Sequence, residues 1–267
     1  MEPYISLRYR DLLTRHGLDT FAGFWDLPRN WVEEPNVRRN GWSGASRYTL
    51  VDGDGCSLSM VVKLQENHKY RSLRYPLKGR PTFYRDFVNI RRLEQIGVPT
   101  AEPVFYGERR KGDNLQALLV TAGLDGYLEL NSVFGDSSLK TSHRQAILHR
   151  VADVLRLIHS HHLQHNCLSG KHVMAKLCEE GAFDIRILDL ERMKRSWGAV
   201  GTAAHDLQKF IRHSPTLSAA EHAELIGHYA RSMSPAQRRK LAVMINRRIA
   251  SKRSARGGAF PVIQLND

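Results

Sequence analysis

Residues 165–172 read His165-Asn166-Cys167-Leu168-Ser169-Gly170-Lys171-His172, and they separate the clearest helical pattern of the chain from two short apolar runs. The helical pattern lies in residues 140–162, where one apolar face is formed by Ile147, Val151, Val154, Leu155 and Ile158. The apolar runs, residues 173–177 and 185–188, predict strands. The polar stretch between them is therefore expected to be a loop, which is where binding and catalytic side chains concentrate.

The second apolar run ends on a carboxylate, within Ile185-Arg186-Ile187-Leu188-Asp189-Leu190-Glu191. A carboxylate in this place either coordinates a ligand or caps the element that follows. Both interpretations of Asp189 stay open, and its surroundings favour coordination.

Upstream of residue 125 the pattern is mainly that of strands. Residues 46–51 and 57–64 predict a hairpin around the turn Asp52-Gly53-Asp54-Gly55. Apolar residues three or four apart predict a helix over residues 81–96, which Gly97 and Pro99 end. Residues 104–106 and 117–122 predict two further strands, and residues 69–80 a basic, aromatic loop. Residues 1–38 are expected to be a lead-in that packs on a later domain.

From about residue 130 onward the chain is mainly helical, with a break at Ser214-Pro215. We therefore predict an α+β protein whose boundary lies near residues 124–130. Residues 1–125 would form an N-terminal extension and a strand-rich domain, and residues 126–267 a helical domain.

Two features of the strand-rich half point to phosphate binding. In Asn40-Gly41-Trp42-Ser43-Gly44-Ala45-Ser46, Gly41 and Gly44 would let the backbone approach phosphate oxygens, and the hydroxyls of Ser43 and Ser46 could donate to them. A plain turn is the commoner explanation of such a stretch. Lys63 is the only charged residue in residues 60–64, so it either has an anionic partner or faces solvent on an edge strand.

Composition sets the broad class of the protein. The 267 residues include 40 Lys+Arg and 27 Asp+Glu, a net charge of +13, with 42% hydrophobic residues. This mixture excludes a wholly disordered or fibrous chain and predicts an anionic partner. The three cysteines, Cys56, Cys167 and Cys178, lack CxxC spacing, so neither a zinc ribbon nor a disulfide framework is expected. No secretory signal or membrane-spanning stretch is apparent, and we expect a cytoplasmic protein.

These features follow the order found in a protein-kinase-like phosphotransferase. The order is a glycine-containing loop, a lysine on a strand, a long helix, a polar loop and an aspartate at the end of a strand. The chain resembles the lipopolysaccharide kinase/InaA family, the Kdo/WaaP group of bacterial kinase-like proteins, and most closely its InaA branch. The resemblance covers about residues 20–210, and it is carried by residues 40–46, 83–87, 97–100, 103–109, 165–172 and 187–192.

The resemblance implies a two-lobed fold that binds ATP in the cleft between a small antiparallel-sheet N-lobe with one helix and a larger, mainly helical C-lobe. Lys63 and the 40–46 loop would hold the nucleotide phosphates. Asp86 would be the helix partner of Lys63, with Glu94 as a rival. Asp189 would hold Mg²⁺, with help from Glu191, and residues 121–126 would be the hinge.

The 165–172 loop departs from the kinase pattern. Kinases typically have His-x-Asp and an Asn five residues after the Asp, whereas this chain has His165-x-Cys167 and then His172. The catalytic side chains implied for this loop are Cys167, His165 and Lys171, and His172 would be the second metal ligand. A thiol holds negative charge at neutral pH only if its pKa falls, and imidazole suits Mg²⁺ less well than an oxygen ligand does.

Two functions remain open from the sequence. One is an ATP-dependent kinase acting on a sugar hydroxyl of the lipopolysaccharide core or a related envelope glycolipid. The other is a catalytically impaired pseudokinase that serves as a binding or stress-response regulatory protein. Cys167 and His172 favour the second function, while Lys63 and Asp189 favour the first.

Two further basic features have structural and functional explanations. His161 and His165 have a metal-compatible spacing, but cations at a helix C-terminus explain them equally simply. Residues 238–253 predict a basic amphipathic helix, which is either a solvated face or a surface that docks on the inner membrane or on an anionic glycolipid. Nucleic acid is not expected as a partner, because no helix-turn-helix, RNP or zinc-finger pattern occurs.

Overall fold

The chain divides into two structural units in a computed structural model that describes residues 2–32, 34–38, 41–53, 57–72, 75–178, 182–256 and 262–265. The first unit comprises Met1–Arg92 and Ala101–Asp125, and the second comprises Leu93–Thr100 and Gly126–Asp267.

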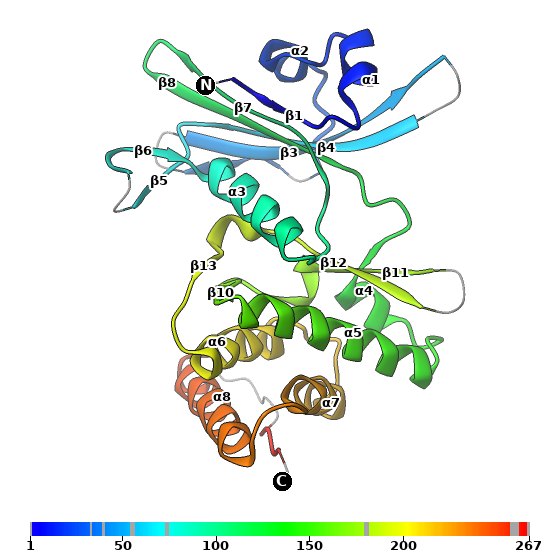
Figure 1. Ribbon diagram of the computed structural model, residues 1–267, viewed down its shortest axis with the longest axis vertical. Coiled ribbons are helices and arrows are strands. Elements are labelled where there is room, and N and C mark those ends of the chain that lie inside the picture. Colours follow the sequence, from blue (N-terminus) through cyan, green and yellow to red (C-terminus); the bar gives the residue numbers. More distant parts are fainter. Residues whose placement is uncertain are drawn as a thin grey trace. The chain divides into compact units, whose positions relative to one another are not determined.

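A six-stranded antiparallel sheet forms the first unit, in the order β1-β7-β8-β4-β3-β2 (Figure 1). Its strands are β1 (Tyr4–Ile5), β2 (Asn36–Arg38), β3 (Gly41–Val51), β4 (Ser57–Glu66), β7 (Pro103–Lys111) and β8 (Asn114–Ala122). A separate hairpin pairs β5 (Lys69–Ser72) with β6 (Tyr75–Pro81). The helices are α1 (Arg10–Arg15), α2 (Phe21–Trp25) and α3 (Thr82–Gln95), of which α3 continues into the second unit.

The alternation of side chains along β4 sets the two faces of this sheet. Met60, Val62 and Leu64 are buried in one cluster with Leu13, Leu18 and Phe24 from α1, α2 and the segment between them. Residues between them on β4 face the opposite side, as the period of two in a strand requires. On that side the Gln65 side chain accepts hydrogen bonds from the Thr82 hydroxyl and the Phe83 amide, so the start of α3 is fixed there.

Most sequence predictions for this unit are confirmed. The hairpin, the helix and the two later strands are present as β3–β4, α3 and β7–β8, and residues 4–5 of the lead-in pair with β7. Two predictions were wrong: residues 69–80 form most of the β5–β6 hairpin rather than a loop, and residues 41–46 belong to β3. Local composition cannot show strand pairing, which depends on the partner that a segment meets. Asn40, Asp54 and Gly55 lie outside the described residues.

Helices dominate the second unit: α4 (Leu130–Gly135), α5 (Thr141–Ser160), α6 (Ala199–Arg212), α7 (Ala219–Ala230) and α8 (Pro235–Arg256) (Figure 1). Helix α5 packs on α7, and α6 packs on α8. The predicted break at residues 214–215 lies between α6 and α7, where Ser218 begins α7 with a reciprocal capping box to Glu221. A second break, between α7 and α8, was not predicted.

Two small antiparallel sheets accompany these helices. β9 (Leu128–Glu129), β11 (Val173–Leu177) and β12 (Phe183–Ile187) form an antiparallel sheet, and β10 (Leu163–Gln164) pairs with β13 (Lys194–Arg195). Short 3₁₀ turns cover Gly170–His172 and Leu190–Arg192. Helices and antiparallel sheets together are consistent with the predicted α+β class. No helix among the described residues is long and apolar enough to cross a membrane.

Candidate functional site

The register of the β11–β12 hairpin brings the two polar loops of the second unit together. Val173 pairs with Ile187, so the residues just before β11 lie beside those just after β12. The amide of Leu188 donates to the carbonyl of His172 at 2.9 Å and extends this pairing by one step. Residues 165–172 and Asp189, which lie apart in the sequence, therefore form one site.

Cys167, His172 and Asp189 meet at this place with one ligand atom each, all within 4.8 Å of one another. The Cys167 Sγ lies 3.4 Å from Oδ2 of Asp189, and Nε2 of His172 lies 3.3 Å from the same oxygen. The side chains of His172 and Asp189 are 28% and 37% exposed, so solvent and small ions reach the cluster.

His165 supports this cluster from the interior. Its Nε2 lies 2.9 Å from the carbonyl of Leu188 and must donate to it, which leaves the lone pair of Nδ1 toward Cys167 Sγ at 3.6 Å. Complete burial lowers the pKa of His165, so the ring is held neutral. The predicted pair of His161 and His165 is not brought to a common ligand, because His161 is an exposed C-cap residue.

The Cys167 thiol is held protonated. Burial, followed by the adjacent Asp189 carboxylate, raises the pKa of this thiol well above its ordinary value. A protonated thiol donates a hydrogen bond and cannot accept the proton of a substrate hydroxyl. In the ligand-free protein, Cys167 is therefore not equipped to replace a catalytic carboxylate as a base.

Asp206 of α6 holds the backbone of the loop, and the sequence analysis missed this residue. Its fully buried carboxylate accepts from the amides of His165 at 2.6 Å and Asn166 at 2.9 Å, and it lies 3.2 Å from Nε2 of His159. Burial by itself would raise the pKa of Asp206, but His159 and the loop amides lower it overall. The signal available in the sequence was a single acidic residue on the apolar face of residues 199–212.

Two residues of the site have left-handed backbones without being glycine. Asn166 has φ 67° and Asp189 has φ 58°, a region that Asn and Asp tolerate better than other residues. These conformations are uncommon and concentrate at functional sites, where surrounding contacts hold them. The backbones of Asn166 and Asp189 therefore mark this place as a candidate functional site.

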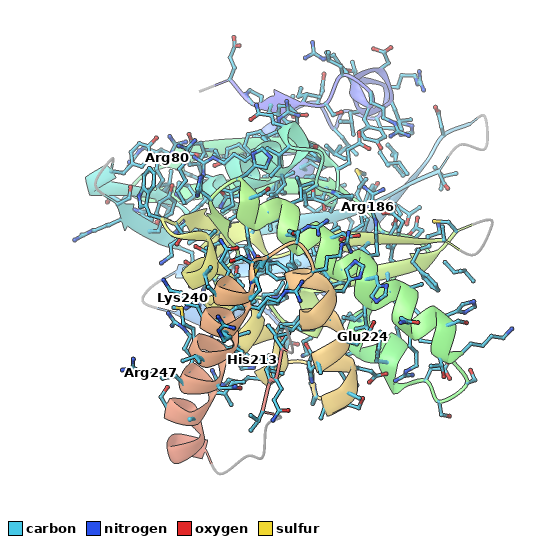
Figure 2. The ribbon with its side chains drawn as sticks, turned by 60° about the horizontal axis from the view of Figure 1, so that its bottom comes forward. Arg80, Arg186, His213, Glu224, Lys240 and Arg247 are labelled. Carbon is cyan, nitrogen blue, oxygen red and sulfur yellow. The ribbon has the colours of Figure 1, made fainter. Side chains whose placement is uncertain are left out.

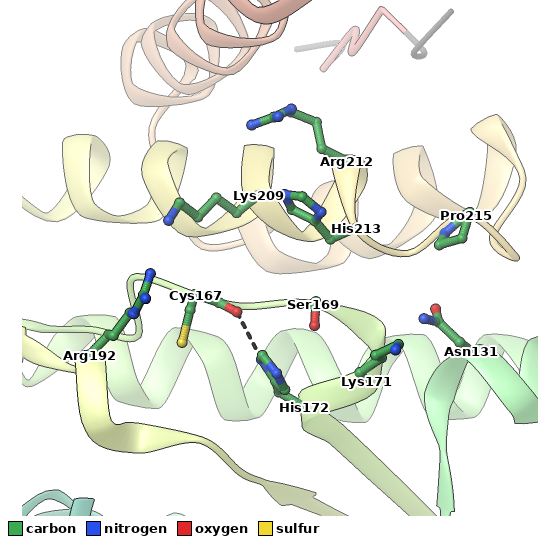
Figure 3. Close-up of a pocket in the computed structure, with 10 residues that line it drawn as sticks. All are labelled: Asn131, Cys167, Ser169, Lys171, His172, Arg192, Lys209, Arg212, His213 and Pro215. Carbon is green, nitrogen blue, oxygen red and sulfur yellow. Dashed lines mark hydrogen bonds between the residues drawn. The ribbon is translucent and has the colours of Figure 1, made fainter. Parts of the chain in front are cut away.

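A pocket of about 530 Å³ opens beside the loop and carries four cations. Figure 3 shows Lys209, Arg212 and His213 opposite the loop that carries Cys167, Ser169, Lys171 and His172. The lining residues are Asn131, Cys167, Ser169, Lys171, His172, Arg192, Lys209, Arg212, His213 and Pro215, and none of these is acidic. Nε of Arg212 is buried without a hydrogen-bond partner in the described part of the chain. The pocket is suited to an anion.

Lys63 and Asp86 form an ion pair in the first unit, with 2.7 Å between Nζ and Oδ2. The Asp86 side chain is 4% exposed and that of Lys63 is 26% exposed, so the pair is desolvated on the carboxylate side only. Asp86 thus forms an ion pair with Lys63. The sequence analysis named Asp86 as the helix partner of Lys63 and Glu94 as its rival. The lysine retains access to a ligand.

The glycines of residues 41–46 have packing roles in β3. A Cβ on Gly44 would lie 2.6 Å from the ring of Trp31, and one on Gly41 would lie 2.7 Å from the backbone of Asn67. The hydroxyl of Ser46 is bonded to the backbone of Asn30, and Ser43 lies in the sheet opposite Gln65. The lack of a side chain at Gly41 and Gly44 is thus explained by packing within the sheet. Phosphate binding by Gly41, Ser43, Gly44 and Ser46 stays a prediction.

Magnesium fits the donor atoms at Asp189 only in part. Mg²⁺ takes oxygen ligands in a near-octahedral set, often one or two carboxylates together with substrate phosphates. Asp189 offers such an oxygen, but the neighbouring donors are the imidazole nitrogen of His172 and the sulfur of Cys167. As a set, the three side chains suit a softer cation better than magnesium.

Comparison with known proteins identifies relatives of this chain. The family model described as the lipopolysaccharide kinase (Kdo/WaaP) family matches residues 22–229. Protein InaA of Escherichia coli (strain K12) is 32% identical over 214 residues, which cover 79% of this chain and 95% of that protein. The matched region includes Lys63, Asp86, the 165–172 loop, Asp189 and Asp206.

Replacing Asp206 tests its hold on the loop. Asp206→Asn removes the charge and turns one acceptor oxygen into a donor that faces a backbone N–H. We expect the free energy of unfolding to fall by about 3 kcal/mol, because two loop amides and His159 lose their buried charged acceptor. We also expect faster hydrogen exchange at the amides of His165 and Asn166, measured under native conditions.

The matched control is Asp113→Asn, in the exposed turn between β7 and β8. It should leave both quantities unchanged. Unaltered exchange at His165 and Asn166 in Asp206→Asn would show that other contacts hold the loop.

Proposed function

Because the chain belongs to the lipopolysaccharide kinase (Kdo/WaaP) family, we propose that it transfers phosphate from ATP to a sugar hydroxyl of the lipopolysaccharide core or of a related envelope glycolipid. The observation that carries this proposal is the ion pair between Lys63 and Asp86. A strand lysine oriented by a helix carboxylate is the arrangement with which kinases hold nucleotide phosphates. The proposal requires a two-lobed, protein-kinase-like arrangement in which one ATP contacts both units.

The nucleotide is bound through its phosphates. Nζ of Lys63, oriented by Asp86, donates to phosphate oxygens, and such charge-assisted hydrogen bonds are about twice as strong as neutral ones. Residues 40–46 would contribute further hydrogen-bond donors to these phosphates. A divalent cation would accompany the nucleotide at Asp189, where the neighbouring donors Cys167 and His172 are poor ligands for magnesium.

The acceptor is anionic and occupies the pocket beside the 165–172 loop. Lys171, Arg192, Lys209 and Arg212 line this pocket, and none of its ten described lining residues is acidic. Lys209 also donates to the carbonyl of Asn166, so one of these cations steadies the loop itself. Such a pocket suits the phosphate or carboxylate groups of a charged glycolipid, and it would position the acceptor hydroxyl near Cys167.

Transfer proceeds without a carboxylate base. The transition state of phosphoryl transfer is loose, so positioning and charge stabilisation supply most of the catalysis. A general base typically contributes about 10²–10⁴-fold. The acceptor proton passes to solvent or to the transferred phosphate, and we expect a slow enzyme.

A second function is favoured by the state of Cys167. A protonated thiol at the position of the catalytic carboxylate is what a pseudokinase would have, and such a protein would bind nucleotide or glycolipid as a regulator. In that case the Lys63–Asp86 pair and the cationic pocket serve binding alone. The two functions differ in phosphate transfer and agree in ligand binding.

Helix α8 offers a basic surface for peripheral contact with the inner face of the inner membrane. Leu241, Ile245 and Ile249 are buried, so the apolar face is not available for insertion. Lys240 and Arg247 project from the exposed side of the helix (Figure 2). Any membrane contact would therefore be electrostatic, at about 1 kcal/mol for each basic residue near anionic lipid.

Removing the ammonium of Lys63 should weaken ATP binding. For Lys63→Ala we expect at least about tenfold weaker affinity, the value of roughly one charge-assisted hydrogen bond. Isothermal titration with Mg²⁺-ATP measures it. Lys111→Ala, at the exposed end of β7, is the control and should bind as the wild type does.

The double variant Lys63→Ala/Asp86→Ala removes both charges of the pair and guards against misfolding from a buried carboxylate. It should also lose ATP affinity while keeping a cooperative thermal transition. Wild-type ATP affinity in both variants would remove Lys63 from the nucleotide site.

Phosphate transfer separates the two functions. With labelled ATP and phosphorylated core oligosaccharide, we expect slow transfer by the wild type and faster transfer by Cys167→Asp, which restores the carboxylate.

Lys171→Ala should raise the KM for the oligosaccharide about tenfold and leave the KM for ATP unchanged. ATP binding without transfer in any variant would establish the pseudokinase function.

Neutralising α8 tests the membrane contact. We expect Arg239→Gln/Lys240→Gln/Arg247→Gln to bind vesicles of anionic phospholipid about 10- to 100-fold more weakly at low salt, with ATP affinity unchanged. Vesicle co-sedimentation measures this. The control Arg10→Gln/Arg71→Gln/Lys111→Gln removes the same charge from exposed positions in the first unit, and an equal loss there would show that net charge alone is responsible.

A further inference from the structure

Three side chains with different donor atoms converge where the 165–172 loop passes Asp189. We propose that Cys167, His172 and Asp189 form a binding site for a divalent transition-metal ion of the zinc type. This site shares Asp189 and Cys167 with the proposed phosphate-transfer site, but its ligands all belong to the second unit and its test needs no nucleotide.

The separations of the ligand atoms match a tetrahedral zinc ion. Zinc bonds to nitrogen and oxygen of about 2.0 Å place those two atoms about 3.3 Å apart, and a bond to sulfur of about 2.3 Å gives an S···O separation of about 3.5 Å. The observed separations from Asp189 Oδ2 are 3.3 Å to Nε2 of His172 and 3.4 Å to Sγ of Cys167. The remaining pair, Sγ and Nε2, lies within 4.8 Å and closes with a shift of roughly 1 Å.

His172 is oriented as metal-binding histidines are. Its Nδ1 lies 2.8 Å from the carbonyl oxygen of Cys167, an acceptor only, so Nδ1 carries the proton and donates (Figure 3). Metal-ligating histidines typically donate their second nitrogen to a carbonyl or carboxylate in this way. The second nitrogen, Nε2, lies 3.3 Å from Oδ2 of Asp189, a separation at which one cation can bind both atoms.

The donor set selects the kind of cation. Sulfur, imidazole nitrogen and carboxylate oxygen together suit zinc and its neighbours, whereas Mg²⁺ and Ca²⁺ favour oxygen alone. On binding, the S–H bond of Cys167 breaks, its proton leaves to solvent and a sulfur–metal bond forms, with no change in oxidation state. Three protein ligands leave a fourth position open on the exposed side, as in zinc sites that bind water or substrate.

Without a metal, the same geometry is satisfied by an ion pair. A protonated His172 would donate to Asp189, and the thiol of Cys167 would donate to the same carboxylate. Both states place the side chains alike, so only metal binding separates them.

Spectroscopy with cobalt identifies the sulfur ligand. The full chain carrying Cys56→Ser and Cys178→Ser keeps Cys167 as its single thiol among the three cysteines. After chelation and dialysis under reducing conditions, it is titrated with Co²⁺, without nucleotide. We expect one equivalent to bind with a thiolate-to-cobalt charge-transfer band that Zn²⁺ displaces, and Zn²⁺ affinity at least about 100-fold above that for Mg²⁺.

Single substitutions assign each ligand. In the same background, Cys167→Ser should abolish the charge-transfer band, and His172→Gln and Asp189→Asn should each weaken Zn²⁺ binding at least about tenfold. His213→Gln changes a neighbouring histidine of the pocket outside the cluster and should leave binding intact. Far-ultraviolet circular dichroism confirms that each variant is folded before titration.

Three results would overturn the proposal. The first is no Zn²⁺ binding by the folded protein, which would leave the His172–Asp189 ion pair as the whole explanation. The second is Co²⁺ binding with no charge-transfer band, or with a band that survives Cys167→Ser. The third is equal affinity for Mg²⁺ and Zn²⁺. None of these results bears on ATP binding through Lys63, so the two proposals fail separately.

Discussion

The buried carboxylate of Asp206 is the constraint on which the functional loop depends. An unpaired charge in the interior is costly, so a carboxylate with no exposed surface persists only where donors surround it. Here the donors are two consecutive loop amides and a histidine from α5. The Asp206 side chain thereby joins α5, α6 and the start of the loop. It holds the backbone of the two residues that precede Cys167 by one and two positions.

The second support of the site is the β11–β12 hairpin. Its register determines that the end of the loop meets the residue after β12, and the left-handed backbone of Asp189 directs its carboxylate to the cluster. The loop and the strand-end aspartate are thus brought together, while residues 167 and 172 differ from the kinase pattern. A thiol and an imidazole stand where the kinase pattern has oxygen donors, and this exchange alters both the proton chemistry and the preferred cation.

The sequence predicted a residue's role well where that role depends on neighbouring residues in the chain, and poorly where it depends on contacts with distant ones. Lys63, the only charge in residues 60–64, was expected either to have an anionic partner or to face solvent, and the ion pair with Asp86 shows the first. The glycines at 41 and 44 suggested a phosphate loop, but Trp31 and Asn67 explain their lack of a side chain. Asp206 was missed because its importance comes from amides some forty residues away, which a periodicity argument does not see.

The family was recognised from the resemblance of this chain to known proteins. The sequence by itself determined the α+β class, the longer strands, the helices at residues 82–95 and 141–160, and the residue types at the loop. These follow from hydrophobic periodicity and motif order, which are properties of neighbouring residues. Only the tertiary structure decided that Cys167, His172 and Asp189 share one site, that the thiol stays protonated, and that four cations line the adjoining pocket. Burial, dielectric environment and ligand geometry arise from residues distant in the chain, and folding alone brings those residues together.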